Sequence, residues 1–136
     1  MRRDYCSHRL TLFRLENEFL SLHMRTFHAL LSERYWDASP IHGTEQGLTE
    51  EEATGLRSYL LFFCKMQALR RDGLLDLVGM DRMFGYRFFI AMHDRHVQRI
   101  LRAEAGYLEQ LYPLYNEWLT FRKKEGTIIP KGFLHI

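Results

Sequence analysis

The sequence has few residues that interrupt helices, and it lacks the patterning that is typical of β-strands. Three prolines occur among 136 residues, at positions 40, 113 and 130. No run alternates apolar and polar residues between turn residues, as a β-hairpin would require. Apolar residues instead recur every three or four positions, which is typical of helices packed on a core. We therefore predict an all-α fold, a compact up-and-down bundle of four or five helices that forms one domain over residues 1–136.

Cysteine and long apolar runs are also scarce. Two scattered cysteines, Cys6 and Cys64, cannot form a disulfide framework, so a reducing, cytoplasmic compartment is expected. The longest strongly apolar stretch, residues 59–64, is far too short to span a bilayer. Charged residues soon after Arg2 and Arg3 interrupt what would otherwise resemble a signal peptide. We expect a cytoplasmic chain that does not insert into a membrane.

No motif of an enzyme is evident. The sequence contains no Gly-x-Ser-x-Gly elbow, no phosphate-binding glycine loop and no thiol-enzyme motif around a cysteine. His93, Asp94 and His96 offer groups that bind zinc or iron, but no further ligand group outside this run is marked by spacing. A helix junction capped by Asp94 accounts for the same residues. We predict no catalytic residues, no metal and no cofactor.

A long first helix is predicted from about residue 10 to residue 35. Its apolar residues form two neighbouring stripes, Leu12, Leu15, Phe19 and Leu22 in one and Phe13, Leu20 and Phe27 in the other. So wide an apolar face is typical of a helix packed against two neighbours rather than one. Residues 36–48 contain Pro40, Gly43 and Gly47 and are expected to form a loop.

Capping signals mark the later helices. Thr49 and Glu52 match a capping box at the start of a helix that should end at Gly73. Asp76 or Asp81 could begin the next helix, which runs to about residue 93. The following helix is predicted to begin after the cap at residue 94.

The last helical pattern runs from about residue 104 to residue 124. Pro113 lies inside it and is expected to kink it or to separate two helices. Residues 126–136 are too apolar for a free tail, and we expect them to dock on this domain or on a partner.

Residues 83–89 form the densest aromatic segment of the chain. On a helix their side chains point in all directions, so some must face a second helix, solvent or another protein. Tyr, Phe and Arg are residue types that anchor interfaces, while core packing on two sides is the alternative. We predict a non-catalytic module for protein–protein interaction or self-assembly. The predicted partner-binding residues are Phe84, Tyr86, Arg87, Phe88, Phe133 and Ile136.

A row of arginines suggests a different partner. Arg95, Arg99 and Arg102 are spaced by four and three and therefore share one helix face. Such a row could follow the phosphates of a nucleic acid. A solvated helix face explains the same spacing, and the net charge of +2 is too small to indicate a polyanion partner by itself. Nucleic-acid binding is the alternative function.

Five segments resemble a loose bacterial family of small helical proteins of unknown function, some of which are labelled phage abortive-infection proteins. The segments are residues 61–63, 69–76, 84–88, 112–115 and 118–119. The similarity covers under half of the chain, and many family members carry transmembrane helices, which are not evident here. The resemblance implies a helical accessory or sensor module in antiviral defence, and it implies no catalytic residues.

Overall fold

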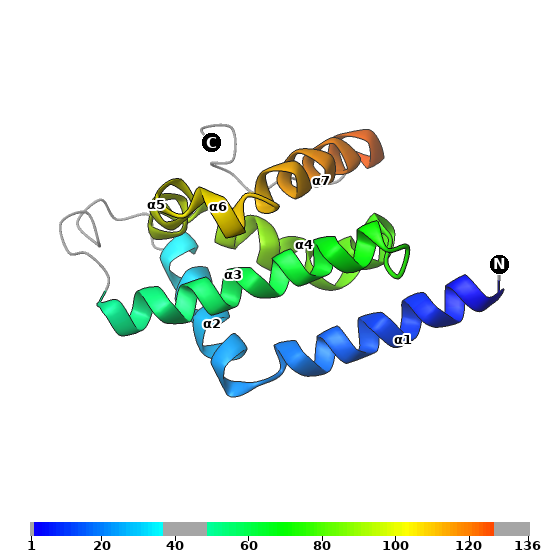
Figure 1. Ribbon diagram of the computed structural model, residues 1–136, viewed down its shortest axis with the longest axis horizontal. Helices are drawn as coiled ribbons and strands as arrows, with labels where there is room; N and C mark the ends of the chain where they lie inside the picture. The colour runs from blue at the N-terminus through cyan, green and yellow to red at the C-terminus, as the bar shows by residue number, and fades with distance from the viewer. Residues whose placement is uncertain (1, 37–48, 127–136) are drawn as a thin grey trace.

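The computed structural model describes residues 2–36 and 49–126, and the regular structure of these residues is entirely helical (Figure 1). The elements are α1 (Arg2–Phe19), α2 (Leu22–Trp36), α3 (Glu50–Arg71), α4 (Leu77–His93), α5 (Arg95–Ala103), α6 (Ala105–Leu108) and α7 (Leu111–Glu125). The predicted all-α class is confirmed, and the predicted number of four or five helices was too low. One of the additional elements, α6, is a single turn.

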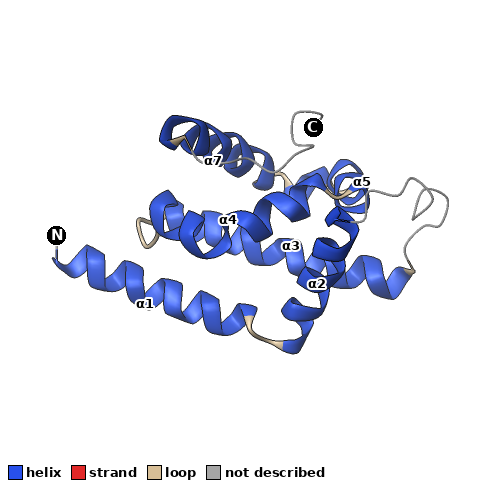
Figure 2. Ribbon diagram, turned by 180° about the vertical axis from the view of Figure 1, so that it is seen from behind, coloured by secondary structure: helices blue, strands red, loops and turns tan. Residues whose placement is uncertain are grey.

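The pair α3 and α4 forms the middle of the compact structure. In both views α1 and α7 lie on opposite sides of this pair (Figure 1, Figure 2). From the end of α1, α2 turns steeply (Figure 1) and packs against both α3 and α4. Because α2 crosses its neighbours, the arrangement departs from a simple up-and-down bundle. The short helices α5 and α6 pack on α3 and lead into α7.

The single long first helix predicted for residues 10–35 is wrong. Instead, α1 ends at Phe19, and Leu20 and Ser21 form a turn before α2 begins. Ser21 Oγ accepts a hydrogen bond from the backbone N–H of Met24 at 3.3 Å, so it caps the new helix. A serine side chain offers the backbone an alternative to the next helical hydrogen bond. The apolar stripes keep their spacing across this turn, and periodicity therefore conceals the break.

Helix capping follows the sequence signals closely. Thr49 and Glu52 form the predicted capping box at the start of α3. Gly73 takes the left-handed conformation, with φ +80°, just after that helix. Asp76, one of the two predicted alternatives, caps α4 by accepting a hydrogen bond from the N–H of Gly79 at 2.8 Å.

The later boundaries also agree with the predicted caps. The side chain of Asp94 accepts hydrogen bonds from the N–H groups of His96 and Val97 and so begins α5. Pro113 lies in the first turn of α7 and separates this helix from α6, which is one of the two predicted outcomes. The predicted loop and the predicted docked tail lie outside the described residues, except for Trp36, which ends α2, and Gly126, which follows α7.

Aromatic rings fill much of the core. Phe88 stacks on Trp118 with ring centroids 4.5 Å apart and an interplanar angle of 12°. Most other pairs meet edge to face, including Phe19 with Tyr59 and with Phe62. These are the geometries that aromatic quadrupoles favour, and each buried ring also removes a large apolar area from water.

Candidate interaction surfaces

Two opposite faces of α1 are apolar, and only one of them is covered. Leu15 and Phe19 point into the core, and each is 2% exposed. Leu10 and Phe13 lie on the other side of the helix by its periodicity, and they are 51% and 59% exposed. Leu20 continues this spacing and is 54% exposed. We call Leu10, Phe13 and Leu20 the α1 outer strip.

The predicted second stripe of the first helix is therefore only partly packed. Phe27 does find a second neighbour, because its ring lies against Gly55 of α3, where any side chain would collide with it. Phe13 and Leu20 have no such cover. The first residue of α2, Leu22, is 74% exposed and extends the apolar surface past the turn.

The aromatic segment of α4 is divided between the core and the surface. Phe84 and Phe88 are fully buried, so the prediction that they contact a partner is corrected in favour of core packing on two sides. Tyr86 is 42% exposed and Arg87 is half-buried, so both can be reached from outside. Phe133 and Ile136 lie outside the described residues.

The guanidinium of Arg87 lies over an aromatic ring rather than beside a carboxylate. Its Cζ is 4.4 Å from the ring centroid of Phe19 and 6.0 Å from that of Phe84. Within the described part of the chain, this guanidinium forms no hydrogen bond or ion pair. Nearby, the ring of Tyr86 meets that of His28 edge to face at 6.5 Å.

The arginine row on α5 is exposed along its whole length. Arg95, Arg99 and Arg102 all face solvent, and none of them forms an ion pair with another residue of the described ranges. The opposite face of the helix is buried through His96, Val97, Ile100 and Leu101. The structure therefore brings the three guanidinium groups to one face, as their spacing predicts.

In the described part of the chain, the residues at the α4–α5 junction contribute to a helix cap and to the core. Asp94 uses one carboxylate oxygen to cap α5, and His96 is buried. Among residues 2–36 and 49–126, no group of three or more His, Cys, Asp or Glu side chains could hold a metal ion. Burial raises the pKa of the Cys64 thiol to about 11, so this sulfur is a poor nucleophile at neutral pH.

A largely buried ion pair, which was not predicted from the sequence, joins α4 to α7. Arg122 Nε donates to Asp81 Oδ1 at 2.7 Å, and Trp118 Nε1 donates to the same oxygen at 2.8 Å. The guanidinium also lies over the ring of Phe89, with 5.0 Å from Cζ to the centroid. Gly85 makes room for the pair, since a Cβ there would meet both charged groups. An isolated glycine four residues after an aspartate, inside a helical pattern, was the available signal.

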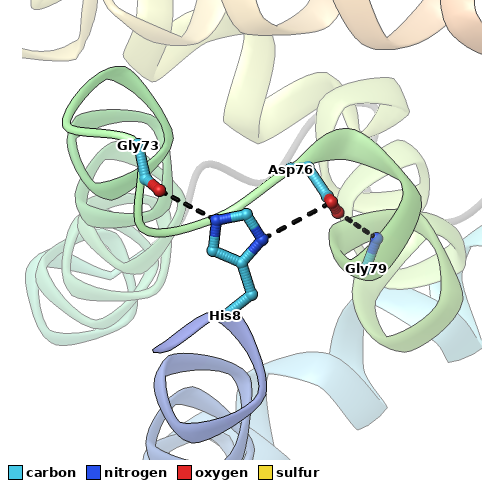
Figure 3. A network of polar contacts seen from close by, with 4 residues as sticks. All are labelled: His8, Gly73, Asp76 and Gly79. Atoms are coloured by element: carbon cyan, nitrogen blue, oxygen red, sulfur yellow. Dashed lines mark hydrogen bonds and ion pairs between the residues drawn. The ribbon is translucent and has the colours of Figure 1, made fainter. Parts of the chain in front are cut away.

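A second polar contact fastens α1 to the loop between α3 and α4 (Figure 3). His8 Nε2 lies 2.8 Å from the carbonyl oxygen of Gly73, and His8 Nδ1 lies 3.5 Å from Asp76 Oδ2. The other carboxylate oxygen of Asp76 accepts the N–H of Gly79. Both partners of the His8 ring are hydrogen-bond acceptors, so the doubly protonated ring can donate to both of them.

No described helix has both the length and the apolar character needed to cross a membrane. No protein-family model, no curated protein and no solved structure matches the chain. The resemblance to the abortive-infection family therefore stays a prediction.

Proposed function

We propose that the protein is a non-catalytic, cytoplasmic module for protein–protein interaction, and that it associates with a second copy of itself through the α1 outer strip. The observation that carries the proposal is the exposure of Leu10 and Phe13 on α1, and of Leu20 in the turn after it, while the opposite face of α1 is already packed. A row of exposed apolar side chains on one face commonly marks an interaction site. Burying one large apolar side chain contributes about 1.5–3 kcal/mol.

Charges beside the strip are compatible with pairing of two copies. Arg9, Arg14 and Glu16 are exposed on α1 beside the strip, so its rim carries both signs of charge. Two such faces can pair opposite charges, whereas a rim of one sign would repel its copy.

Light scattering across a concentration series tests this proposal. The wild-type chain should approach a dimer mass, twice 16.4 kDa or about 33 kDa. The double variant Leu10→Glu/Phe13→Glu should raise the dimer dissociation constant at least tenfold, because it places charge at the contact. Leu61→Glu/Val78→Glu is the matched control, since these apolar residues of α3 and α4 are also exposed. A monomer at every concentration, or equal weakening by the control, would contradict self-association.

Nucleic-acid binding is the second candidate, and the exposed row of Arg95, Arg99 and Arg102 supports it. Three phosphate contacts on duplex DNA give a slope of roughly −2.7 for log affinity against log salt. Fluorescence polarisation with labelled RNA and DNA should show this slope. Changing all three arginines to Glu should abolish the binding. The control changes Arg25, Arg71 and Arg82 to Glu, an equal change of charge on other helices. Binding that is insensitive to the α5 variant would dismiss this candidate.

The family resemblance would make the module an accessory or sensor component of bacterial antiviral defence. The prediction is that a bacterial host expressing the wild-type chain shows at least tenfold fewer plaques than a host carrying an empty vector. The variant with a charged α1 outer strip should lose this protection if assembly is required for it.

A further inference from the structure

Phe19 is the centre of a cluster to which four helices contribute. Its ring centroid lies 5.9 Å from that of His28 in α2 and 5.7 Å from that of Tyr59 in α3. From α4, the ring of Phe84 lies 5.7 Å away, and Arg87 places its Cζ 4.4 Å from the centroid. The cluster thus gathers an imidazole, a phenol and a guanidinium around one buried ring.

These three polar groups lack hydrogen-bond partners within the described residues. The hydroxyl of Tyr59 and Nδ1 of His28 are buried without a partner. Arg87 contributes a half-buried guanidinium that contacts rings but no acceptor among residues 2–36 and 49–126. Buried polar groups in folded proteins are almost always satisfied, so three together at one place call for an occupant.

The charge of the cluster is well defined at neutral pH. Burial, and after it the positive charge of Arg87, lowers the pKa of His28, so this ring is neutral. Burial raises the pKa of Tyr59, against a smaller opposing effect of Arg87, so the phenol keeps its proton. The cluster therefore carries a single positive charge, and its tyrosine and arginine groups can donate hydrogen bonds.

We propose that Arg87, His28 and Tyr59 form a binding site for a carboxylate group at the junction of α1, α2, α3 and α4. The planar fork of an arginine matches the two oxygens of a carboxylate, and a monoanion balances the single charge. Half-buried Arg87 and His28, together with exposed Tyr86, give access from the surface between α2 and α4. The α1 outer strip lies on the other side of α1 from Phe19, so this site is independent of the proposed self-association.

The carboxylate could belong to a small organic acid or to an Asp or Glu side chain of another protein, and the chemistry at Arg87 is the same in both cases. A carboxylate bound there would favour the charged form of His28. The wild-type protein can therefore report on binding through the titration of this ring, without any substitution.

The first experiment follows the histidine rings by NMR during pH titrations in sodium acetate and in sodium chloride of equal ionic strength. Acetate should raise the titration midpoint of His28 by at least half a pH unit relative to chloride. His23 is the internal control, because it lies on the same helix and is exposed. Equal midpoints of His28 in the two salts, or equal movement of His28 and His23, would overturn the proposal.

Variants then assign the binding to the guanidinium. Arg87→Lys keeps the charge but loses the fork, and it should weaken acetate binding at least tenfold, whereas Arg82→Lys, an exposed position on the same helix, should not. Tyr59→Phe should weaken acetate binding severalfold by removing one donor. Unchanged acetate affinity in Arg87→Lys would overturn the assignment, as would tighter binding of inorganic phosphate than of acetate.

A comparison of probes identifies the source of the carboxylate. Acetate and the capped peptide Ac-Ala-Glu-Ala-NH2 both present one carboxylate. Tighter binding of acetate would support a small acid as the ligand, and tighter binding of the peptide would support an acidic side chain of a protein. Light scattering measures self-association through the α1 outer strip independently, so a negative result for one proposal does not contradict the other.

Discussion

Arg122 Nε lies 2.7 Å from Asp81 Oδ1, and this pair joins the last helix to the middle of the fold at a place where Arg122 is only 8% exposed. Trp118 donates to the same carboxylate. Removing one member of such a pair leaves the other charge without compensation in a poorly solvated position, which costs more than the pair contributes.

Asp81→Ala should therefore lower the free energy of unfolding by about 3 kcal/mol, the lower end for a broken buried pair. Urea denaturation followed by circular dichroism measures this loss. Glu109→Ala removes an exposed carboxylate and should change stability by about 0.5 kcal/mol or less. A loss below 1 kcal/mol for Asp81→Ala would mean that the pair is solvated.

Gly85→Ala should destabilise the protein by about 1–3 kcal/mol, although alanine is the better helix former. The added methyl group would collide with the guanidinium of Arg122 and with the Asp81 carboxylate. Gly106→Ala is the matched control in α6, where a Cβ meets nothing within 4 Å. It should be neutral or stabilise by up to about 1 kcal/mol. Thermal unfolding of both variants in one buffer makes the comparison direct.

Stability should fall as the pH is lowered through about 6.5, and His28 should contribute to the fall. Its pKa is lowered in the folded state by burial and by Arg87, so the unfolded chain binds the proton more tightly. The contribution of the neutral ring to the free energy of unfolding is fully present above pH 6.5 and is lost progressively below that value. Urea midpoints in acetate-free buffer between pH 7.5 and 5 should show a shallower decline for His28→Phe than for the wild-type chain. Parallel curves would count against this assignment.

Asp76 has two roles that substitutions can separate, because it contacts His8 and also caps α4. His8→Ala should cost only about 0.5 kcal/mol, as is usual for a partly exposed pair. Asp76→Ala should cost about 1–2 kcal/mol, because it also removes the cap of α4. Asp76→Asn keeps a capping oxygen and loses the charge, so its cost should match that of His8→Ala. Hydrogen exchange should show faster opening of α1 in His8→Ala. Unchanged exchange would indicate that the other contacts of α1 are sufficient to hold it in place.

The two faces of α1 should respond oppositely to substitution. Leu15→Ala creates a cavity in the core and should cost about 2–5 kcal/mol in stability. Phe13→Glu on the α1 outer strip should change stability by about 0.5 kcal/mol or less, because its side chain is already largely in water. Chemical denaturation at a protein concentration below the dimer dissociation constant isolates the monomer for this test.

Local signals predicted the helices well because each signal acts over a few residues. Four local features occur at positions that the sequence offered for them: the capping box at Thr49, the caps at Asp76 and Asp94, and the left-handed Gly73. The break at Ser21 escaped prediction because the apolar spacing continues through it.

Contacts between residues far apart in the sequence could not be predicted from such local signals. Periodicity identifies an apolar face but not what covers it, so Phe27 against Gly55 and exposed Phe13 were indistinguishable in sequence. Phe84 and Phe88 were assigned to a surface because the aromatic segment is dense, yet α4 is covered on both sides. The pairing of Asp81 with Arg122 joins residues 41 positions apart and depends on the packing of α4 against α7.

If the α1 outer strip mediates assembly, the covered and open faces of α1 should be under different selective pressures. Residues of the inner face must stay apolar in any relative that folds, whatever that relative binds. Leu10, Phe13 and Leu20 contribute little to folding, so mutation should replace them with polar residues within a lineage that has lost the contact. Persistence of apolar side chains at these three positions in diverged relatives would therefore record selection for assembly, separately from selection for stability.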